Sequence, residues 1–342
     1  MVSCAMRRTD LIHLCLMLIA LGLAYVVPFE LLVLAFVVLG PAHYTTEISW
    51  LHERRYFAPR RGYAVALAVI AVGAALITSA AWFGFTMWAA LVLGALLVTP
   101  RAGVQGVTLV IAAIGLTAIF YMRWPAFAVI GVLLPTLIHV SVFTLIFMAL
   151  GAWRARSAPQ TGLIAVYLAA IALIVFVPPT GATVIPRFAT IAGDYFGNVA
   201  QALGVLFGTS DIHLDMRLTG LLAFLYTYHY LNWFIKAEVI RWADIPRQRW
   251  LVIGTVSAAS TGLYFYDYAL GLSVLLALSL AHVVLEFPLN ALAIRQLGEA
   301  AGNGLMVLMV RPHGSHARVT AASGSARLRE RHSRPGRARQ PR

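Results

Sequence analysis

Long apolar segments separated by short polar turns dominate the pattern of the chain. Arg, Pro and Gly mark the ends of these segments, and most segments are long enough to cross a hydrocarbon core of about 30 Å as a helix. We predict about ten transmembrane helices, over residues 10–27, 29–51, 62–79, 81–99, 104–122, 126–152, 162–178, 217–236, 250–266 and 269–293. The expected fold class is therefore all-α, a polytopic integral membrane helical bundle.

The composition agrees with this pattern. Of the 342 residues, 61% are hydrophobic and only 11% are charged, which lies far outside the range of ordinary soluble domains. The basic start and apolar run at the N-terminus would also suit a secretory signal. We favour an uncleaved first helix, because a second apolar segment follows almost at once. With only Cys4 and Cys15, the chain offers neither a disulfide framework nor a thiolate metal cluster.

Positively charged residues are distributed unevenly between the two sides of the predicted bundle. If the N-terminus is cytoplasmic, one side holds Arg7, Arg8, Arg54, Arg55, Arg60, Arg61, Arg101, Arg154, Arg156, Lys236, Arg241, Arg247 and Arg249. The other side holds only Arg123, Arg187 and Arg217. Because cytoplasmic loops are enriched in Lys and Arg, this asymmetry predicts that both termini are cytoplasmic. The expected location is a bacterial-type inner (plasma) membrane.

Two segments differ from the apolar spans. Residues 179–216 are too polar in places to cross the bilayer, and we expect them to lie at its external interface. Residues 1–298 form the predicted transmembrane domain, and residues 299–342 a basic, disordered cytoplasmic tail. The last 32 residues hold nine Arg and one Glu, and the whole chain has a net charge of +13. The expected partner of the tail is anionic lipid, whereas nucleic acid is disfavoured in a membrane protein.

Candidate chemistry begins with a motif that occurs twice. His43 and Glu47 stand four residues apart in the second predicted span, and His282 and Glu286 have the same spacing in the last. On a helix this spacing places both side chains on one face. Imidazole and carboxylate groups from two helices could therefore converge on one metal ion.

Depth in the membrane adds two further histidines, one each in the sixth and eighth predicted spans. The four His precede the basic end of their helices by 11, 15, 12 and 13 residues, counted from His43 to Arg54, His139 to Arg154, His229 to Arg241 and His282 to Arg295. A spread of four residues corresponds to about 6 Å along a helix. The four imidazoles are therefore expected to lie in one layer.

The expected site is a metal centre with His43, His139, His229, His282, Glu47 and Glu286 as ligands. Iron fits this donor set, and zinc or copper is less favoured. The face of the eighth span that carries His229 also presents three residues expected to support the ligands, namely Tyr226, Asn232 and Lys236. Lys236 is interpreted either as a snorkelling anchor or as a charge partner of one of the two glutamates. His13 and His52, near the cytoplasmic boundary, are expected to be interfacial.

A buried iron site suggests activation of O₂ beside a lipophilic small molecule that stays in the bilayer. In this respect the chain resembles the Brp/Blh family of membrane β-carotene central-cleavage dioxygenases. The resemblance lies in topology and in His43, His139, His229 and His282 as intramembrane His on separate spans. It implies a non-haem iron oxygenase with a carotenoid- or isoprenoid-like substrate. The chain lacks the HxxH and HxxHH boxes of membrane fatty-acid desaturases and hydroxylases.

Other hypotheses use the same residues. Two of the His could ligate haem b axially, which would make the chain a membrane redox protein. Alternatively, the His and Glu could relay protons or bind a cation in a transporter. A non-catalytic membrane scaffold, in which these polar groups only contact one another, also remains open.

Overall fold

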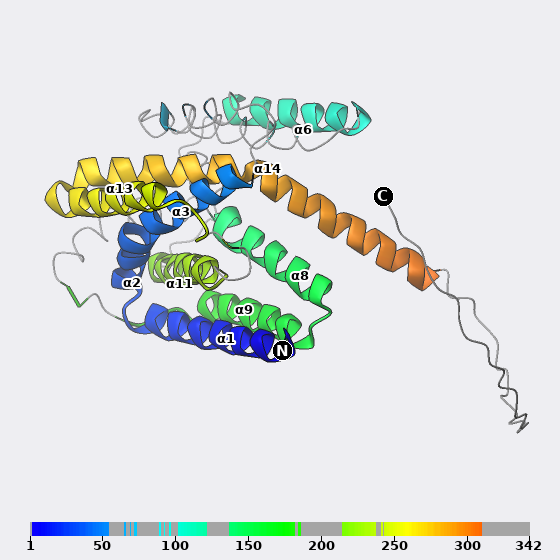
Figure 1. Cartoon of the computed structure of the whole chain (residues 1–342), viewed down its shortest axis with the longest axis horizontal. Helices are drawn as coiled ribbons and strands as arrows, with labels where there is room; N and C mark the ends of the chain where they lie inside the picture. The colour runs from blue at the N-terminus through cyan, green and yellow to red at the C-terminus, as the bar shows by residue number, and fades with distance from the viewer. Residues whose placement is uncertain are drawn as a thin grey trace, which may run out of the picture. The chain divides into compact units, whose positions relative to one another are not determined.

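The computed structural model describes residues 2–54, 102–121, 137–181, 184–185, 214–236, 241 and 243–309, together with isolated helical positions between 65 and 96. Every regular element in these ranges is a helix (Figure 1). The elements are α1 (Val2–Val26), α2 (Pro28–Leu34), η1 (Ala35–Leu39), α3 (Gly40–Glu53), α6 (Ala102–Tyr121), η2 (Ile138–Phe143), α8 (Thr144–Ala155), α9 (Ala158–Phe176), α11 (Leu214–Ile235), α13 (Arg247–Tyr266) and α14 (Tyr268–Met309).

Five helical segments in the described part of the chain are long and apolar enough to cross a membrane. They are Arg8–Val26, Pro28–Glu53, Ile138–Ala155, Ala158–Phe176 and Leu270–Ala300. The chain is therefore an all-helical protein whose apolar helices indicate contact with a lipid bilayer. The predicted spans 104–122, 217–236 and 250–266 also form helices, α6, α11 and α13. Most of the predicted spans 62–79 and 81–99 lies outside the described residues.

Helix boundaries differ from the predicted ones for local reasons. α9 begins at Ala158 rather than near 162, because the Ser157 hydroxyl accepts from the backbone N–H of Gln160 and caps the helix. α14 continues through Pro288 to Met309, beyond the predicted end of the membrane domain at 298. The chain divides into two compact units, Met1–Ala300 and Ala301–Arg342. The tail after Met309 and residues 186–213 of the predicted external segment lie outside the described residues.

Within the first unit, α11 is the central helix. It packs against α1, α2 and α9 and touches both π-helices, η1 and η2 (Figure 1). Its buried side chains include Phe224, Tyr228 and Tyr230, each at most 1% exposed. α11 is not among the five apolar segments because its buried faces carry Tyr, Thr, His and Asn. A helix with this composition needs protein neighbours on most sides, and α11 has them.

Candidate metal centre

His43 and Glu47 lie one turn apart on α3, directly after the π-helix η1. Pro41 stands in the first turn of α3 and has no N–H, so the carbonyl of Val37 loses its usual helical donor. The hydroxyl of Thr261 on α13 donates to this carbonyl at 2.8 Å. A side chain from a neighbouring helix thus satisfies the break in the backbone ladder immediately before His43.

His139 lies inside the second π-helix, η2. The Tyr167 hydroxyl of α9 donates to the Val140 carbonyl at 3.3 Å, and the Ser141 hydroxyl donates to the Leu137 carbonyl of its own helix. π-turns are rare in proteins and occur frequently at functional sites. Both π-helices of the described chain therefore border or contain a predicted ligand.

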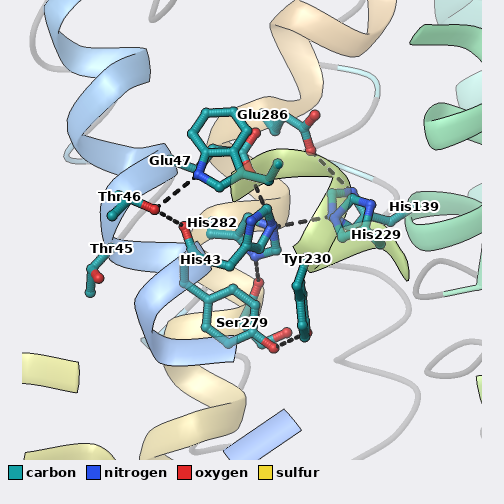
Figure 2. Close-up of polar contacts among 12 residues, drawn as sticks. His43, Thr45, Thr46, Glu47, His139, His229, Tyr230, Ser279, His282 and Glu286 are labelled. Atoms are coloured by element: carbon teal, nitrogen blue, oxygen red, sulfur yellow. Dashed lines mark hydrogen bonds and ion pairs between the residues drawn. The ribbon is translucent and has the colours of Figure 1, made fainter. Parts of the chain in front are cut away.

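The four imidazoles form a closed ring of edge-to-face contacts, which we call the His ring. Its centroid distances are 4.9 Å for His43–His229, 4.9 Å for His229–His139, 4.8 Å for His139–His282 and 5.0 Å for His282–His43. His43, His139 and His282 are at most 2% exposed, and His229 is partly buried. Figure 2 shows these side chains converging from α3, η2, α11 and α14. The structure thus brings together four histidines that are far apart in the sequence.

The two glutamates contact this ring from their predicted positions. Glu47 Oε2 lies 3.0 Å from His43 Nε2 and 3.8 Å from His282 Nε2. Glu286 Oε2 lies 3.1 Å from His139 Nδ1 (Figure 2). Both carboxyl groups are 3% exposed, and such groups need a cation, a proton or hydrogen-bond donors as partners.

Neighbouring groups also constrain the ring nitrogens. His282 Nδ1 is 2.8 Å from the carbonyl of Ser279, so Nδ1 carries the proton and Nε2 presents its lone pair. That Nε2 lies 3.1 Å from His139 Nε2. His229 Nδ1 is 2.8 Å from the Thr144 hydroxyl, and its Nε2 has no hydrogen-bond partner among the described residues. Hydrogen bonds on the outer nitrogens that leave inner nitrogens free are typical of metal-binding histidines.

The donor geometry fits a transition-metal ion. Ligand atoms of the four His all lie within 4.8 Å of one another. At metal–nitrogen distances of about 2.1 Å, opposite ligands of one ion are about 4.2 Å apart and adjacent ligands about 3 Å. The 3.0 and 3.1 Å separations at His43–Glu47 and His139–His282 match adjacent ligands. This His/Glu group could therefore hold a metal ion.

Aromatic side chains cover one side of the His ring. The hydroxyls of Tyr44 and Tyr230 lie 2.5 Å apart. The Tyr44 ring stacks on His282 with centroids 4.6 Å apart, and the Tyr230 ring lies 4.7 Å from that of His43. The indole of Trp233 lies 5.6 Å from His43 on a different side, where its N–H donates to the Thr46 hydroxyl at 3.0 Å. The two tyrosine rings restrict the orientation of His43 and His282.

The three predicted supporting residues of α11 have different surroundings. The ring of Tyr226 packs against Tyr230 with centroids 5.7 Å apart. Asn232 is 8% exposed, and its side-chain oxygen lacks a hydrogen-bond partner among the described residues. Lys236 is half-buried at the end of α11. Both glutamates pair with imidazoles rather than with Lys236, which corrects the charge-partner interpretation.

His13, expected near the cytoplasmic boundary, is buried against α11. It is 7% exposed, and its Nδ1 lies 3.3 Å from the Tyr228 hydroxyl of α11. The sequence did not indicate this contact, because the packing of α1 against α11 cannot be read from the distance of a residue to the membrane boundary. His52 is exposed.

Several residues of the site escaped the sequence reasoning. Thr144, the Ser279 carbonyl, Tyr44 and Tyr230 act across helices, so their roles depend on packing that no spacing rule gives. Asn290 did leave a signal, because it continues the spacing of four that links His282 to Glu286 along α14. It is 0% exposed.

Comparisons with known proteins add no assignment. No family model matches the chain, and no curated protein or solved structure matches it significantly.

Proposed function

We propose that the protein is a membrane-embedded non-haem iron oxygenase that acts on a lipophilic, carotenoid- or isoprenoid-like substrate. The observation that carries the proposal is the closed ring of four imidazoles with two buried carboxylates. Imidazole and carboxylate donors suit iron, and a low-polarity site suits O₂ and a hydrocarbon substrate. The resemblance to the Brp/Blh dioxygenases supports the same reaction class.

The residues divide into ligands and supports in this proposal. The four His and Glu47 would hold the iron. Glu286 is positioned differently, because it contacts Nδ1 of His139 while Nε2 of the same ring faces His282. Glu286 therefore acts by orienting His139. When bound, the iron would supply activation of O₂.

Charge balance supports a single ion in this site. One divalent cation neutralises the two carboxylates, and the imidazoles bind as neutral ligands. Tyr44 and Tyr230 then provide an aromatic wall that excludes water from the adjacent side of the ring. A hydrocarbon that dissolves in the bilayer would approach along such a wall rather than through an aqueous channel.

The haem hypothesis is less compatible with this geometry. Axial imidazoles on one haem must face each other across the full width of a porphyrin. Here all four neighbouring ring pairs are in edge-to-face contact, so no planar slot separates them. A proton- or cation-coupled transporter would use the same buried groups, and it is an outcome of the test below.

The topology proposed with this function has ten spans, with both termini in the cytoplasm of a bacterial-type cell. The asymmetry of Arg and Lys supports it. Three ring histidines are each followed at a similar distance by an exposed arginine. These pairs are His43 and Arg54, His139 and Arg154, and His282 and Arg295. Reporter fusions after residues 54, 156 and 309 should all report the cytoplasm, and an external signal from any of them would contradict the proposed orientation.

The first test is metal analysis with an optical spectrum on detergent-purified protein. We expect stoichiometric iron and no Soret band in wild type, and loss of the iron in His229→Ala. His13→Ala is the matched control, because it removes a buried His outside the ring. A Soret band would favour haem. Folded protein that is colourless and metal-free after iron supplementation would contradict the metal site and favour transport or a structural role.

The two glutamates give a second, finer test. Glu47→Gln removes a proposed ligand, whereas Glu286→Gln weakens only the orientation of His139. We expect both to lower iron affinity, with Glu286→Gln limited to about 10–100-fold, as for other groups that hold a ligand in place. The iron absorption spectrum should change in Glu47→Gln and stay close to wild type in Glu286→Gln. Unchanged iron affinity in both variants would remove the carboxylates from the site.

A further inference from the structure

A cavity of about 290 Å³ lies where α3 ends and α13 begins, away from the His ring. α3 and α13 pack against each other, and charged side chains gather at this end of the pair. The cavity is lined by Trp50, Glu53, Arg54, Arg241, Asp244 and Ile245. Ligand pockets in proteins begin at about 300 Å³, so this cavity has the size for a small polar group rather than for a whole cofactor.

The charges around the cavity favour an anion. Arg249 Nη1 pairs with Glu53 Oε2 at 2.6 Å, and Arg241 Nε pairs with Asp244 Oδ2 at 2.5 Å. With Arg54, three arginines face two carboxylates, which leaves one positive charge. A guanidinium carries five N–H donors, and the pair with Asp244 uses the Nε of Arg241. Arg241 can therefore bind a second anion while it keeps its acidic partner.

The backbone of Arg241 has an unusual conformation. Its φ of 54° lies in the left-handed region, which side chains other than Gly, Asn and Asp rarely adopt. Arg156 also has a positive φ, but it is the C-cap of α8, where this conformation is common. Arg241 lies beyond the end of α11 at Ile235, and its side chain lines the cavity. Strain of this kind gathers at ligand-binding sites, where it places a side chain for its task.

The apolar surroundings indicate that the anion belongs to a lipid. Trp50 is half-buried, and Trp side chains collect at the level of lipid head groups. Ile245 adds an apolar contact within the cavity. From Arg249, α13 continues with Leu251 and Val252, which are 73% and 61% exposed and can contact an acyl chain. A soluble phosphate ester would use the arginines alone, whereas a phospholipid uses the arginines and this apolar surface.

We propose that this cavity binds the phosphate group of an anionic phospholipid. The planar guanidinium groups of Arg54 and Arg241 match the oxygens of a phosphate, and Trp50 and Ile245 contact the glycerol part. The single negative charge of a phosphodiester balances the net charge of the cavity. The bound lipid would join the end of α3 to the start of α13. This site goes beyond the proposed oxygenase, and it is separate from the basic tail.

Native mass spectrometry of the detergent-purified full chain tests the proposal. The probe is phosphatidylglycerol, and the matched ligand is diacylglycerol with the same acyl chains, which lacks the phosphate. Wild type should bind phosphatidylglycerol at least about tenfold more tightly than diacylglycerol, because charge-assisted hydrogen bonds are strong. The double variant Arg54→Gln with Arg241→Gln should lose this preference.

The control variant removes the same charge outside the cavity. It combines Arg247→Gln with Arg295→Gln, two exposed positions that do not line the cavity, and it should keep the preference for phosphatidylglycerol. Both double variants retain the nine Arg of the last 32 residues, so binding of lipid by the tail is common to them. Equal loss in both variants, or no preference in wild type, would overturn the proposal.

Arg241→Gly separates lipid binding from a structural role of this residue. Gly adopts a positive φ without strain, so the Tm of the lipid-free protein should not fall. The affinity for phosphatidylglycerol should fall several-fold, and an unchanged affinity would contradict the role of Arg241. If glycerol 3-phosphate displaces phosphatidylglycerol at equal concentration, the ligand is a soluble phosphate ester and the lipid proposal is wrong. None of these measurements needs iron, so failure of the metal site would leave the expected affinities unchanged.

Discussion

Tyr228 and His229 are adjacent on α11, but their side chains face two different sides of the helix. On the first side the buried polar groups contact one another, and on the second side some of them lack a partner among the described residues. On the first side, the Tyr228 hydroxyl meets His13 Nδ1, and the Tyr167 hydroxyl meets a backbone carbonyl of η2. On the second side, His229 Nε2 and the side-chain oxygen of Asn232 have no hydrogen-bond partner among the described residues. The difference separates packing from binding. Polar groups that satisfy one another stabilise a bundle, whereas buried groups that remain unsatisfied need a ligand.

Metal removal is expected to have the largest effect, which would be measured as a change in Tm. A ligand present at 100 to 1,000 times its Kd stabilises the folded state by about 2.7–4.1 kcal/mol. Chelation should therefore lower the Tm of the detergent-solubilised wild type, and reloading with Fe²⁺ should restore it. His282→Ala should not respond to either treatment, whereas His13→Ala, from the satisfied side, should respond as wild type does. A wild-type Tm that changes with neither chelator nor added metal would contradict the distinction between satisfied and unsatisfied buried polar groups.

A smaller effect is expected at the outer nitrogen of His229. Thr144→Val removes the hydroxyl that lies 2.8 Å from Nδ1 but keeps the side-chain volume. Because such groups orient a ligand, iron affinity should fall about 10–100-fold in a competition titration with a chelator. Ser141→Ala is the control on the preceding π-helix, since that hydroxyl bonds only its own backbone in the described contacts. The same loss in both variants would point to general loosening of η2 and α8.

The smallest effect is expected on the side of α11 where Tyr228 contacts His13. Tyr228→Phe removes the contact with His13 and keeps the ring that stacks against Phe224. Hydrogen bonds between membrane helices contribute on average about 0.6 kcal/mol and at most about 1.7 kcal/mol. We expect a destabilisation of that size in reversible unfolding, with iron content unchanged. Loss of iron in Tyr228→Phe would show that this side also serves the metal centre.

Much of the candidate site was predictable, because the depth of a residue in the membrane can be counted from the basic end of its helix. Counting residues from each His to the basic end of its helix placed four imidazoles in one layer, and the repeated spacing of four pointed both glutamates the same way. The all-helical fold followed from the length of the apolar segments. That these residues meet depends on which helices are neighbours, and the structure supplies this.

What could not be predicted depends on contacts between helices. The spacing of Pro41 indicates a kink, but only packing reveals that Thr261 of α13 satisfies the carbonyl it frees. The π-turns leave no periodic signal, since each shifts the register within a continuous apolar run. The contact of His13 with Tyr228 was not predicted for the same reason, because proximity to a boundary says nothing about the neighbour that covers a residue.

The position of the ring ligands along the chain also sets an order for biosynthesis. From residue 43 to residue 282 is 239 residues, so at about 5–20 residues per second the last imidazole is made about 12–48 s after the first. Throughout that interval the helices already made carry only part of the His ring. An ion that needs all four imidazoles could bind only after α14 has been inserted, which would make metal capture a late step in the assembly of this protein.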